Sequence, residues 1–192
     1  MPSKIILASS STQREKILKD TGITFEIVVS NVDETPVENL SFTEQLKEIS
    51  MRKALAVMLT TVNIGDRIIV AADQNIMFNG KMYGKPKTIE DARELIRSME
   101  GSNEIYAYVG NSILEISENK IIRCVNECDI SRMRMDIVSS QNLEEYLATK
   151  SPLKKCGGIN IFDTPFLHLE EGKLSTAGGL TVEYLIDMLD KI

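Results

Sequence analysis

A run of hydroxyl side chains, Ser9-Ser10-Ser11-Thr12, is followed closely by Arg14. The run comes directly after the apolar residues 4–8 and before a helical pattern, so we expect it where a strand ends and a helix begins. Backbone N–H groups at a helix start, hydroxyl groups and a guanidinium together suit the binding of a phosphate. The alternative is an ordinary Ser or Thr cap, with Arg14 as a solvated helix residue.

Two acidic positions stand out by their surroundings. Asp73 interrupts the apolar run Ile68-Ile69-Val70-Ala71-Ala72, where a carboxylate is costly unless it is paired, bound to a metal or placed at the mouth of a cleft. Glu34 follows Asp33 in a polar loop, after a strand expected at residues 25–29. For Asp73, a structural carboxylate that caps a loop is the alternative.

Lys85 adds positive charge to this set, and it lies in a Gly-Lys-Pro turn. Another lysine, Lys53, lies in the long amphipathic helix expected at residues 41–61. Two carboxylates and several cations around one cleft suit Mg²⁺ and a polyphosphate, because carboxylate oxygens bind the hard cation while Lys and Arg neutralise phosphate charge. The alternative for Lys85 is a solvated lysine at a turn.

Other chemistries are less well supported by the residue pattern. Cys124, Cys128, Cys156 and His168 make a numerically complete zinc set. However, the first two are separated by three residues in an expected strand that has no knuckle glycine, so we expect buried thiols. The single histidine has no nucleophile beside it, which disfavours hydrolysis by a Ser-His-Asp or Cys-His arrangement.

The elements that must hold these residues follow from hydrophobic spacing. Apolar runs predict strands at residues 4–8, 25–29, 67–78, 104–116, 120–137 and 159–169. Helical spacing predicts a helix of about ten residues from Thr12 and helices at residues 41–61, 88–99, 143–149 and 182–192. Asn79-Gly80 and Glu118-Asn119 are expected to reverse the chain in hairpins. The order of elements predicts a mixed α/β sheet with α+β character, flanked by helices.

Composition limits the class of protein and its partners. A chain of 192 residues is large enough for one domain or two small lobes. Its 22 Lys and Arg against 28 Asp and Glu give a net charge of −6, which disfavours nucleic acid as a partner. The sequence has no apolar run near the length of a membrane span, and its opening apolar stretch is too short for a signal peptide. Three cysteines fit a reducing compartment, so we expect a cytoplasmic protein without a membrane partner.

Six sequence blocks occur in an order that is typical of one family. They are Leu7-Ala8-Ser9-Ser10-Ser11 with Arg14, Val32-Asp33-Glu34-Thr35, Lys53, Ala72-Asp73-Gln74, Gly80 with Gly84-Lys85-Pro86, and Tyr146-Leu147 before Cys156-Gly157-Gly158. Together they resemble the Maf (septum formation inhibitor) family of nucleotide pyrophosphatases over essentially the whole chain. The resemblance implies a single Maf-like domain over residues 1–192, similar to the inosine triphosphate pyrophosphatases, elongated and two-lobed with a central cleft. It also implies a homodimer.

The resemblance carries an activity and residue roles with it. Members of the family cleave nucleoside triphosphates between the α and β phosphates, with the help of a divalent metal. By position, the resemblance implies that Glu34 and Asp73 bind Mg²⁺ or Mn²⁺ and orient or deprotonate the attacking water. It implies that the triphosphate is held by Ser9, Ser11, Arg14, Lys53 and Lys85.

The family has two branches that differ in the preferred base. In the dTTP and UTP branch, a Thr usually follows the catalytic Asp, a Lys precedes a late Ala-Gly pair, and a Gln stands several residues on. Here these positions are Gln74, Cys156 and Asp163, which look like the 7-methylguanosine triphosphate branch. An acid at Asp163 is able to accept hydrogen bonds from the N1–H and N2–H₂ edge of guanine. We therefore expect 7-methylguanosine triphosphate as the substrate, with dTTP and UTP as the alternative.

Some positions depart from the family pattern. The usual Pro after the paired serines is Thr12, the usual double arginine is Arg14 followed by Glu15, and the Pro after the closing Gly-Leu is Thr181. An acid beside a phosphate site lowers its positive potential unless the acid points away. These departures leave open a catalytically weakened nucleotide-binding protein that acts through a partner in septum formation. An inosine-triphosphate-type pyrophosphatase is a third hypothesis.

Overall fold

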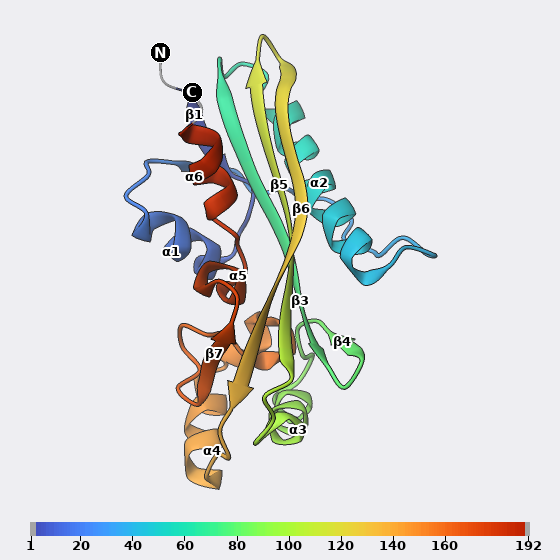
Figure 1. Cartoon of the computed structure of the whole chain (residues 1–192), viewed down its shortest axis with the longest axis vertical. Helices are drawn as coiled ribbons and strands as arrows, with labels where there is room; N and C mark the ends of the chain where they lie inside the picture. The colour runs from blue at the N-terminus through green and yellow to red at the C-terminus, as the bar shows by residue number, and fades with distance from the viewer. Residues whose placement is uncertain (1–2, 191–192) are drawn as a thin grey trace. The chain divides into compact units, whose positions relative to one another are not determined.

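The computed structural model describes residues 3–190 as a mixed α/β fold (Figure 1). Its strands are β1 (Lys4–Leu7), β2 (Glu26–Ile27), β3 (Arg67–Phe78), β4 (Lys81–Tyr83), β5 (Ile105–Ser117), β6 (Lys120–Met135) and β7 (Leu167–Glu171). Its helices are α1 (Thr12–Asp20), α2 (Phe42–Thr60), α3 (Ile89–Met99), α4 (Ser140–Ala148), α5 (Leu174–Gly178) and α6 (Glu183–Leu189). Short 3₁₀ turns occupy Ser151–Lys154 and Cys156–Gly158. The predicted fold class is confirmed.

The sheet contains both parallel and antiparallel pairs. Its strand order is β2-β1-β3-β5-β6-β7, and β4 pairs with β3. β1 is parallel to both β2 and β3, whereas β4 runs antiparallel to β3 and β7 antiparallel to β6. Parallel neighbours need a crossover connection, and α1 and α2 supply these around β1.

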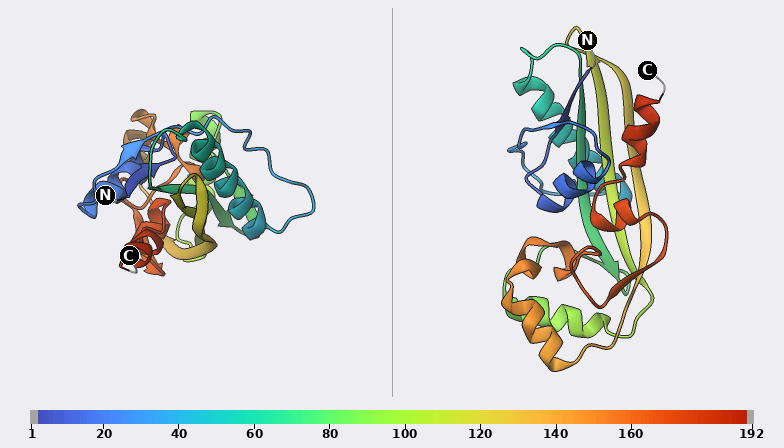
Figure 2. Two further views of the ribbon diagram at one scale, coloured as in Figure 1. Left: turned by 90° about the horizontal axis from the view of Figure 1, so that it is seen from above. Right: turned by 90° about the vertical axis from the view of Figure 1, so that its left-hand side faces the viewer.

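The chain divides into two compact units, each with its own core. The first comprises Met1–Asp73, Val109–Asp129 and Gly179–Ile192, and the second comprises Gln74–Tyr108 and Ile130–Gly178. Strands β3, β5 and β6 contribute residues to both units. In the first unit, α2 lies on one side of the strands, and α1 and α6 lie on the other (Figures 1 and 2). The elongated shape and the central cleft stay predictions.

The hydrophobic core of each unit joins helices to strands. In the first unit, buried side chains of α2 pack against β1, β3 and β5, and the cluster comprises Ile6, Ala8, Ala54, Val57, Ile69, Ala71, Leu114 and Ile116. In the second unit, α3, α4 and the late loops pack on the strands through a larger cluster that includes Ile76, Ile96, Met133, Tyr146 and Phe166. Each unit therefore has a hydrophobic core of its own.

Local sequence signals set the turns and helix starts. Both residues of Asn79-Gly80 have positive φ, as do both residues of Glu118-Asn119, which matches the two-residue hairpin turns predicted there. Ser41 and Glu44 form a capping box at the start of α2, and Thr88 and Asp91 form one at the start of α3. The predicted starts of these two helices are confirmed.

Several predicted boundaries are wrong. The strand expected at residues 159–169 forms only at Leu167–Glu171, because Asn160 and Thr164 close a turn instead. The Asn160 backbone N–H donates to Thr164 Oγ1 at 2.9 Å, and the Thr164 N–H donates to the Asn160 carbonyl at 3.0 Å. α5 was not predicted, and the last two residues of the helix expected at 182–192 lie outside the described residues.

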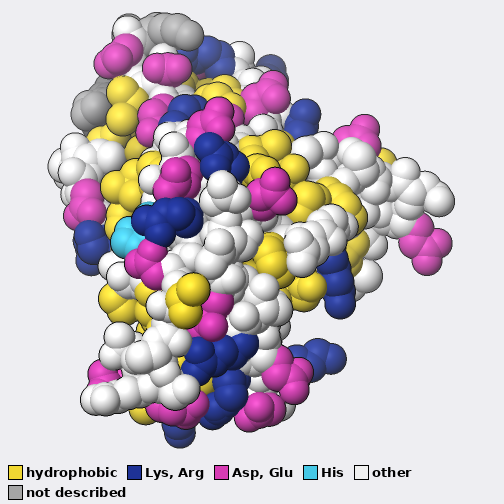
Figure 3. Space-filling view, turned by 60° about the horizontal axis from the view of Figure 1, so that its bottom comes forward, with side chains coloured by type: hydrophobic (Ala, Val, Ile, Leu, Met, Phe, Trp, Pro, Cys, Tyr) yellow, Lys and Arg dark blue, Asp and Glu magenta, His cyan; other side chains and the backbone are white. Residues whose placement is uncertain are grey.

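The surface mixes charges of both signs. On the face in Figure 3, Lys and Arg side chains are interspersed with Asp and Glu, and the histidine lies among them. His168 Nε2 lies 2.7 Å from Asp136 Oδ2, and Arg134 also contacts this carboxylate, so both lower the pKa of Asp136. Within residues 3–190, no helix has both the length and the apolar character needed to cross a membrane.

Gly110 sets how closely α2 approaches β5. It is buried, and a Cβ added there would lie 2.3 Å from the backbone of Leu46 on α2. We predict that Gly110→Ala lowers the free energy of unfolding by about 1–3 kcal/mol, because the helix backbone must move. Urea denaturation measures this, with Gly65→Ala as the control, since Gly65 has open space around it. Equal stability of the two variants would contradict the close approach.

Candidate active site

A buried lysine joins the two acids that the sequence singled out. Lys53 is 5% exposed, and its Nζ lies 2.7 Å from Asp73 Oδ1 and 3.0 Å from Glu34 Oε2. The Asp73 side chain is 13% exposed and that of Glu34 is 60% exposed, so the cluster runs from the interior to the surface. Three of the predicted site residues are therefore brought together by direct contact.

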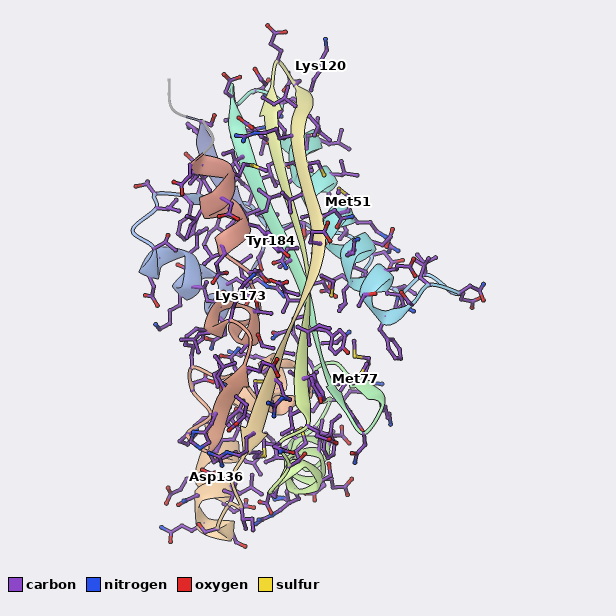
Figure 4. The ribbon with its side chains drawn as sticks, viewed as in Figure 1. Met51, Met77, Lys120, Asp136, Lys173 and Tyr184 are labelled. Atoms are coloured by element: carbon purple, nitrogen blue, oxygen red, sulfur yellow. The ribbon has the colours of Figure 1, made fainter. Side chains whose placement is uncertain are left out.

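The elements on either side explain why these groups meet. Lys53 lies on the buried stripe of α2, between Ser50 and Ala54, at a point marked by the neighbouring Met51 in Figure 4. Residues 67–72 of β3 are buried, whereas Asp73 is partly exposed. A carboxylate at that point needs a counter-charge, which Lys53 supplies. Asp73 thus contacts a cation on a neighbouring helix, whereas the alternative was a loop cap.

The loop that carries Glu34 has internal hydrogen bonds of its own. Asp33 Oδ1 accepts from the Thr35 backbone N–H at 2.8 Å and from the Thr35 hydroxyl at 2.6 Å. These bonds lower the pKa of the Asp33 carboxyl, with a smaller contribution from Arg52. Arg52 also donates to backbone carbonyls of this loop. Arg52 was not predicted as a site residue, because adjacent residues of a helix do not share a face and its position before Lys53 gave no signal.

The hydroxyl run and Arg14 form a second group. Ser11 caps α1 by accepting from the Arg14 N–H at 3.4 Å, and Ser9 Oγ accepts from the Ser11 N–H at 3.1 Å. The Arg14 side chain donates to Ser9 Oγ at 3.2 Å and to the Gly179 carbonyl at 2.8 Å. Ser11 thus caps the helix, and its role in phosphate binding stays a prediction. Arg14 is not the solvated residue of the alternative, because its side chain contacts Ser9 in the serine loop (residues 9–12).

Strand register relates the two groups within the first unit. β1 pairs in parallel with β3, with Leu7 opposite Val70, and the Ala8 N–H donates to the Val70 carbonyl at 2.8 Å. Ser10 and Asp73 stand three residues beyond these two positions, Ser10 after the end of β1 and Asp73 within β3. The serine loop thus leaves the sheet at the carboxyl end of β1, the kind of position where open α/β sheets bind ligands.

Glu15 does not place a free negative charge at this loop. Its carboxylate accepts from Lys19 Nζ at 2.6 Å, one turn along α1. Such an i,i+4 pair balances the acid on the helix surface. Glu15 therefore lowers the positive potential at a phosphate site here less than an unpaired acid would.

The second unit holds three other predicted residues. Lys85 is exposed in the turn after β4, where the Gly84 carbonyl accepts from the Gly157 N–H at 2.8 Å. Gln74 donates from its side chain to the Ala177 carbonyl at 3.2 Å, and its own carbonyl accepts from Cys156 Sγ at 2.9 Å. These bonds tie the start of this unit's part of β3 to the Cys156–Gly158 turn and to α5.

Asp163 is exposed but contacts a buried polar cluster that was not predicted from the sequence. Its carboxylate forms an ion pair with Lys155, which is only 6% exposed. Lys155 Nζ also donates to Tyr146 Oη at 3.3 Å, and Tyr146 donates to the Gly158 carbonyl at 2.9 Å. Burial lowers the pKa of Lys155 and raises that of Tyr146.

The carboxylates present fit a divalent cation shared with substrate. Glu34 and Asp73 bring oxygens to a single nitrogen, so the two carboxylates lie close together. Mg²⁺ is commonly held by one or two carboxylates together with substrate phosphates and water. Residues 3–190 contain no cluster of three or more His, Cys, Asp or Glu side chains arranged to hold a metal. The donor set therefore suits a cation that is completed by phosphate oxygens.

Comparison with known proteins identifies the family. A family model described as "Maf-like protein" matches residues 4–192, and the chain belongs to this family. A dTTP/UTP pyrophosphatase of Pelotomaculum thermopropionicum is 30% identical over 190 residues, which cover 98% of this chain and 96% of the relative. One of Acetivibrio thermocellus is 29% identical over 192 residues, covering 97% and 94%. These names agree with the expected enzyme class, but they favour the alternative substrate and not 7-methylguanosine triphosphate.

A solved structure was also found at greater distance. It is a nucleoside-triphosphatase / dITP/XTP pyrophosphatase of Mycobacterium abscessus, 13% identical, with a TM-score of 0.41 and coverage of 98% of this chain and 96% of that one. At that score it carries no argument about the site.

The buried Lys155 predicts a pH dependence of stability. Its folded pKa lies below the ordinary value of 10.5, so between the two values the unfolded chain binds more protons. Stability contributed by Lys155 therefore rises with pH in that window. We predict that the free energy of unfolding of wild type rises relative to that of Lys155→Met as the pH increases toward 10.5, the upper end of that window. Lys154→Met, at the exposed neighbour, is the control, and parallel curves for Lys155→Met and wild type would contradict the prediction.

Proposed function

We propose that this chain hydrolyses nucleoside triphosphates to the monophosphate and pyrophosphate, with dTTP and UTP as substrates. The observation that carries the proposal is the contact of Lys53 with both Asp73 and Glu34 in a member of the Maf family. The names of the relatives support the choice of substrate. The same proposal includes a single domain over residues 1–192, a homodimer and a cytoplasmic location.

7-Methylguanosine triphosphate is the second candidate, because Gln74 follows Asp73 where the other branch usually has Thr. The Lys155 contact weakens the argument from Asp163, since a carboxylate already matched by a buried ammonium is a poorer acceptor for a guanine edge. We therefore place dTTP and UTP first.

In the proposed mechanism, residues of the first unit bind the triphosphate and handle the attacking water. Ser9, Ser11 and Arg14 offer hydroxyl and guanidinium donors to phosphate oxygens at the start of α1. Lys53 offsets negative charge that builds on the departing pyrophosphate. Lys85, Gln74 and Asp163 keep their proposed roles in substrate binding.

Glu34 and Asp73 would hold the divalent cation, and Asp73 accepts a proton from the attacking water. When bound, Mg²⁺ or Mn²⁺ supplies Lewis-acid activation of water and neutralises phosphate charge. The water oxygen attacks the α phosphorus. The bond from this phosphorus to the oxygen that bridges to the β phosphate breaks, and pyrophosphate leaves with that oxygen.

Asp73→Asn tests the proposed proton acceptor. We predict that kcat falls by about 10²- to 10⁴-fold, because the amide cannot take the proton, while the nucleotide still binds. Pyrophosphate release measures turnover, and calorimetry measures binding. Asp66→Asn is the matched control, since Asp66 is exposed just before β3. An Asp73→Asn protein with normal turnover would remove Asp73 from this role.

A nucleotide panel tests the substrate. We predict that kcat/KM for dTTP and UTP exceeds that for 7-methylguanosine triphosphate and inosine triphosphate by about tenfold or more, because buried polar groups discriminate strongly between bases. Preference for 7-methylguanosine triphosphate would favour the second candidate. Binding of every nucleotide without release of pyrophosphate would instead favour the weakened regulatory protein.

A further inference from the structure

We propose that Arg52 is a positioning residue that fixes the backbone at Glu34, so that the Glu34 carboxylate stays beside Lys53 and Asp73. The inference rests on the proposed function, because it gives Arg52 a role in the same site. It concerns contacts within the first unit alone.

The guanidinium of Arg52 donates hydrogen bonds to the backbone on both sides of Glu34. Its Nη1 donates to the Asp33 carbonyl at 2.9 Å and to the Thr35 carbonyl at 3.1 Å. These are the carbonyls immediately before and after Glu34 in the chain. A single planar group that binds both of them restricts the backbone that carries the acid.

The other side of the guanidinium is fixed to its own helix. Nε of Arg52 donates to Glu48 Oε1 at 2.6 Å, and Nη2 lies 2.5 Å from Glu48 Oε2. The hydrogen bond from Nε and the ion pair hold the guanidinium against α2, one turn from its own backbone. The bond to Glu48 also raises the pKa of Arg52. We call the Arg52 guanidinium, with its contacts to Glu48, Asp33 and Thr35, the clamp. Its contact with Glu48 fixes it to α2.

The loop needs such a clamp because it has little other regular structure. Between β2 and α2, residues 28–41 contain no helix or strand. Glu34 is 60% exposed and forms an ion pair with Lys53, which is the residue after Arg52. Two adjacent residues of α2 therefore act on Glu34, one on its backbone and one on its carboxylate. Without the Arg52 contact, the loop loses more conformational entropy when the Glu34 carboxylate pairs with Lys53, and this loss opposes the pairing.

Arg52→Gln tests the proposal by activity. We predict that kcat falls by about 10- to 100-fold, the usual effect of removing a group that orients a metal-binding or catalytic side chain. KM for the nucleotide changes little, because Arg52 acts through Glu34. Arg93→Gln is the matched control, since Arg93 is 29% exposed against 27% for Arg52 and also pairs with acids of its own and a neighbouring helix.

Two comparisons separate positioning from a merely structural role. In the Glu34→Gln background, Arg52→Gln should add no further loss of kcat, whereas a multiplicative loss would overturn the proposal. Arg52→Lys keeps the charge, but a single ammonium cannot span both carbonyls and Glu48. Full recovery of kcat in Arg52→Lys would also overturn it.

Hydrogen–deuterium exchange gives a readout that does not depend on turnover. We predict that amides of residues 33–36 exchange about tenfold faster in Arg52→Gln, while the core of the first unit exchanges at the wild-type rate. Unchanged exchange in this loop would overturn the clamp. If wild type releases no pyrophosphate from any nucleotide, the proposed function fails, yet this measurement still decides whether Arg52 holds the loop.

Discussion

A buried ammonium group constrains the first unit. Lys53 has almost no contact with solvent, and a charge in that position needs partners of opposite sign. Asp73 on β3 and Glu34 on the loop before α2 supply them. The close approach of α2 to Gly110 on β5 keeps the helix that carries Lys53 against the strands. Packing and charge pairing therefore act together at one place.

The same pairing explains how the cluster suits phosphate chemistry. Two carboxylates share one ammonium, so the group keeps a net negative charge and retains oxygens for a cation. The serine loop and Arg14 supply donors for anionic oxygen at the carboxyl end of β1. The Arg14 guanidinium and the two carboxylates are thus held on separate elements of the first unit.

Features with a local cause could be predicted from the sequence, and features with a long-range cause could not. The Asn79-Gly80 turn and the Ser41 cap depend on neighbouring residues, and both form as predicted. Asp73 was found because a carboxylate in an apolar run is anomalous. Its partner came only from family resemblance, since 20 residues separate it from Lys53. The strand expected at residues 159–169 does not form before Leu167, because Asn160 and Thr164 bond to each other, which periodicity does not reveal.

The choice of base shows why single positions are weak guides to specificity. Asp163, taken alone, presents an acceptor that suits guanine, and the sequence contains nothing near it that would remove that property. In the folded second unit, its carboxylate meets Lys155, whose ammonium is buried against Tyr146. The hydrogen-bonding character of the acid is then a property of the pair, and an aligned acidic residue without such a lysine would not be equivalent. Specificity in this family must therefore be compared between clusters of contacting residues, with the partner of each polar group included.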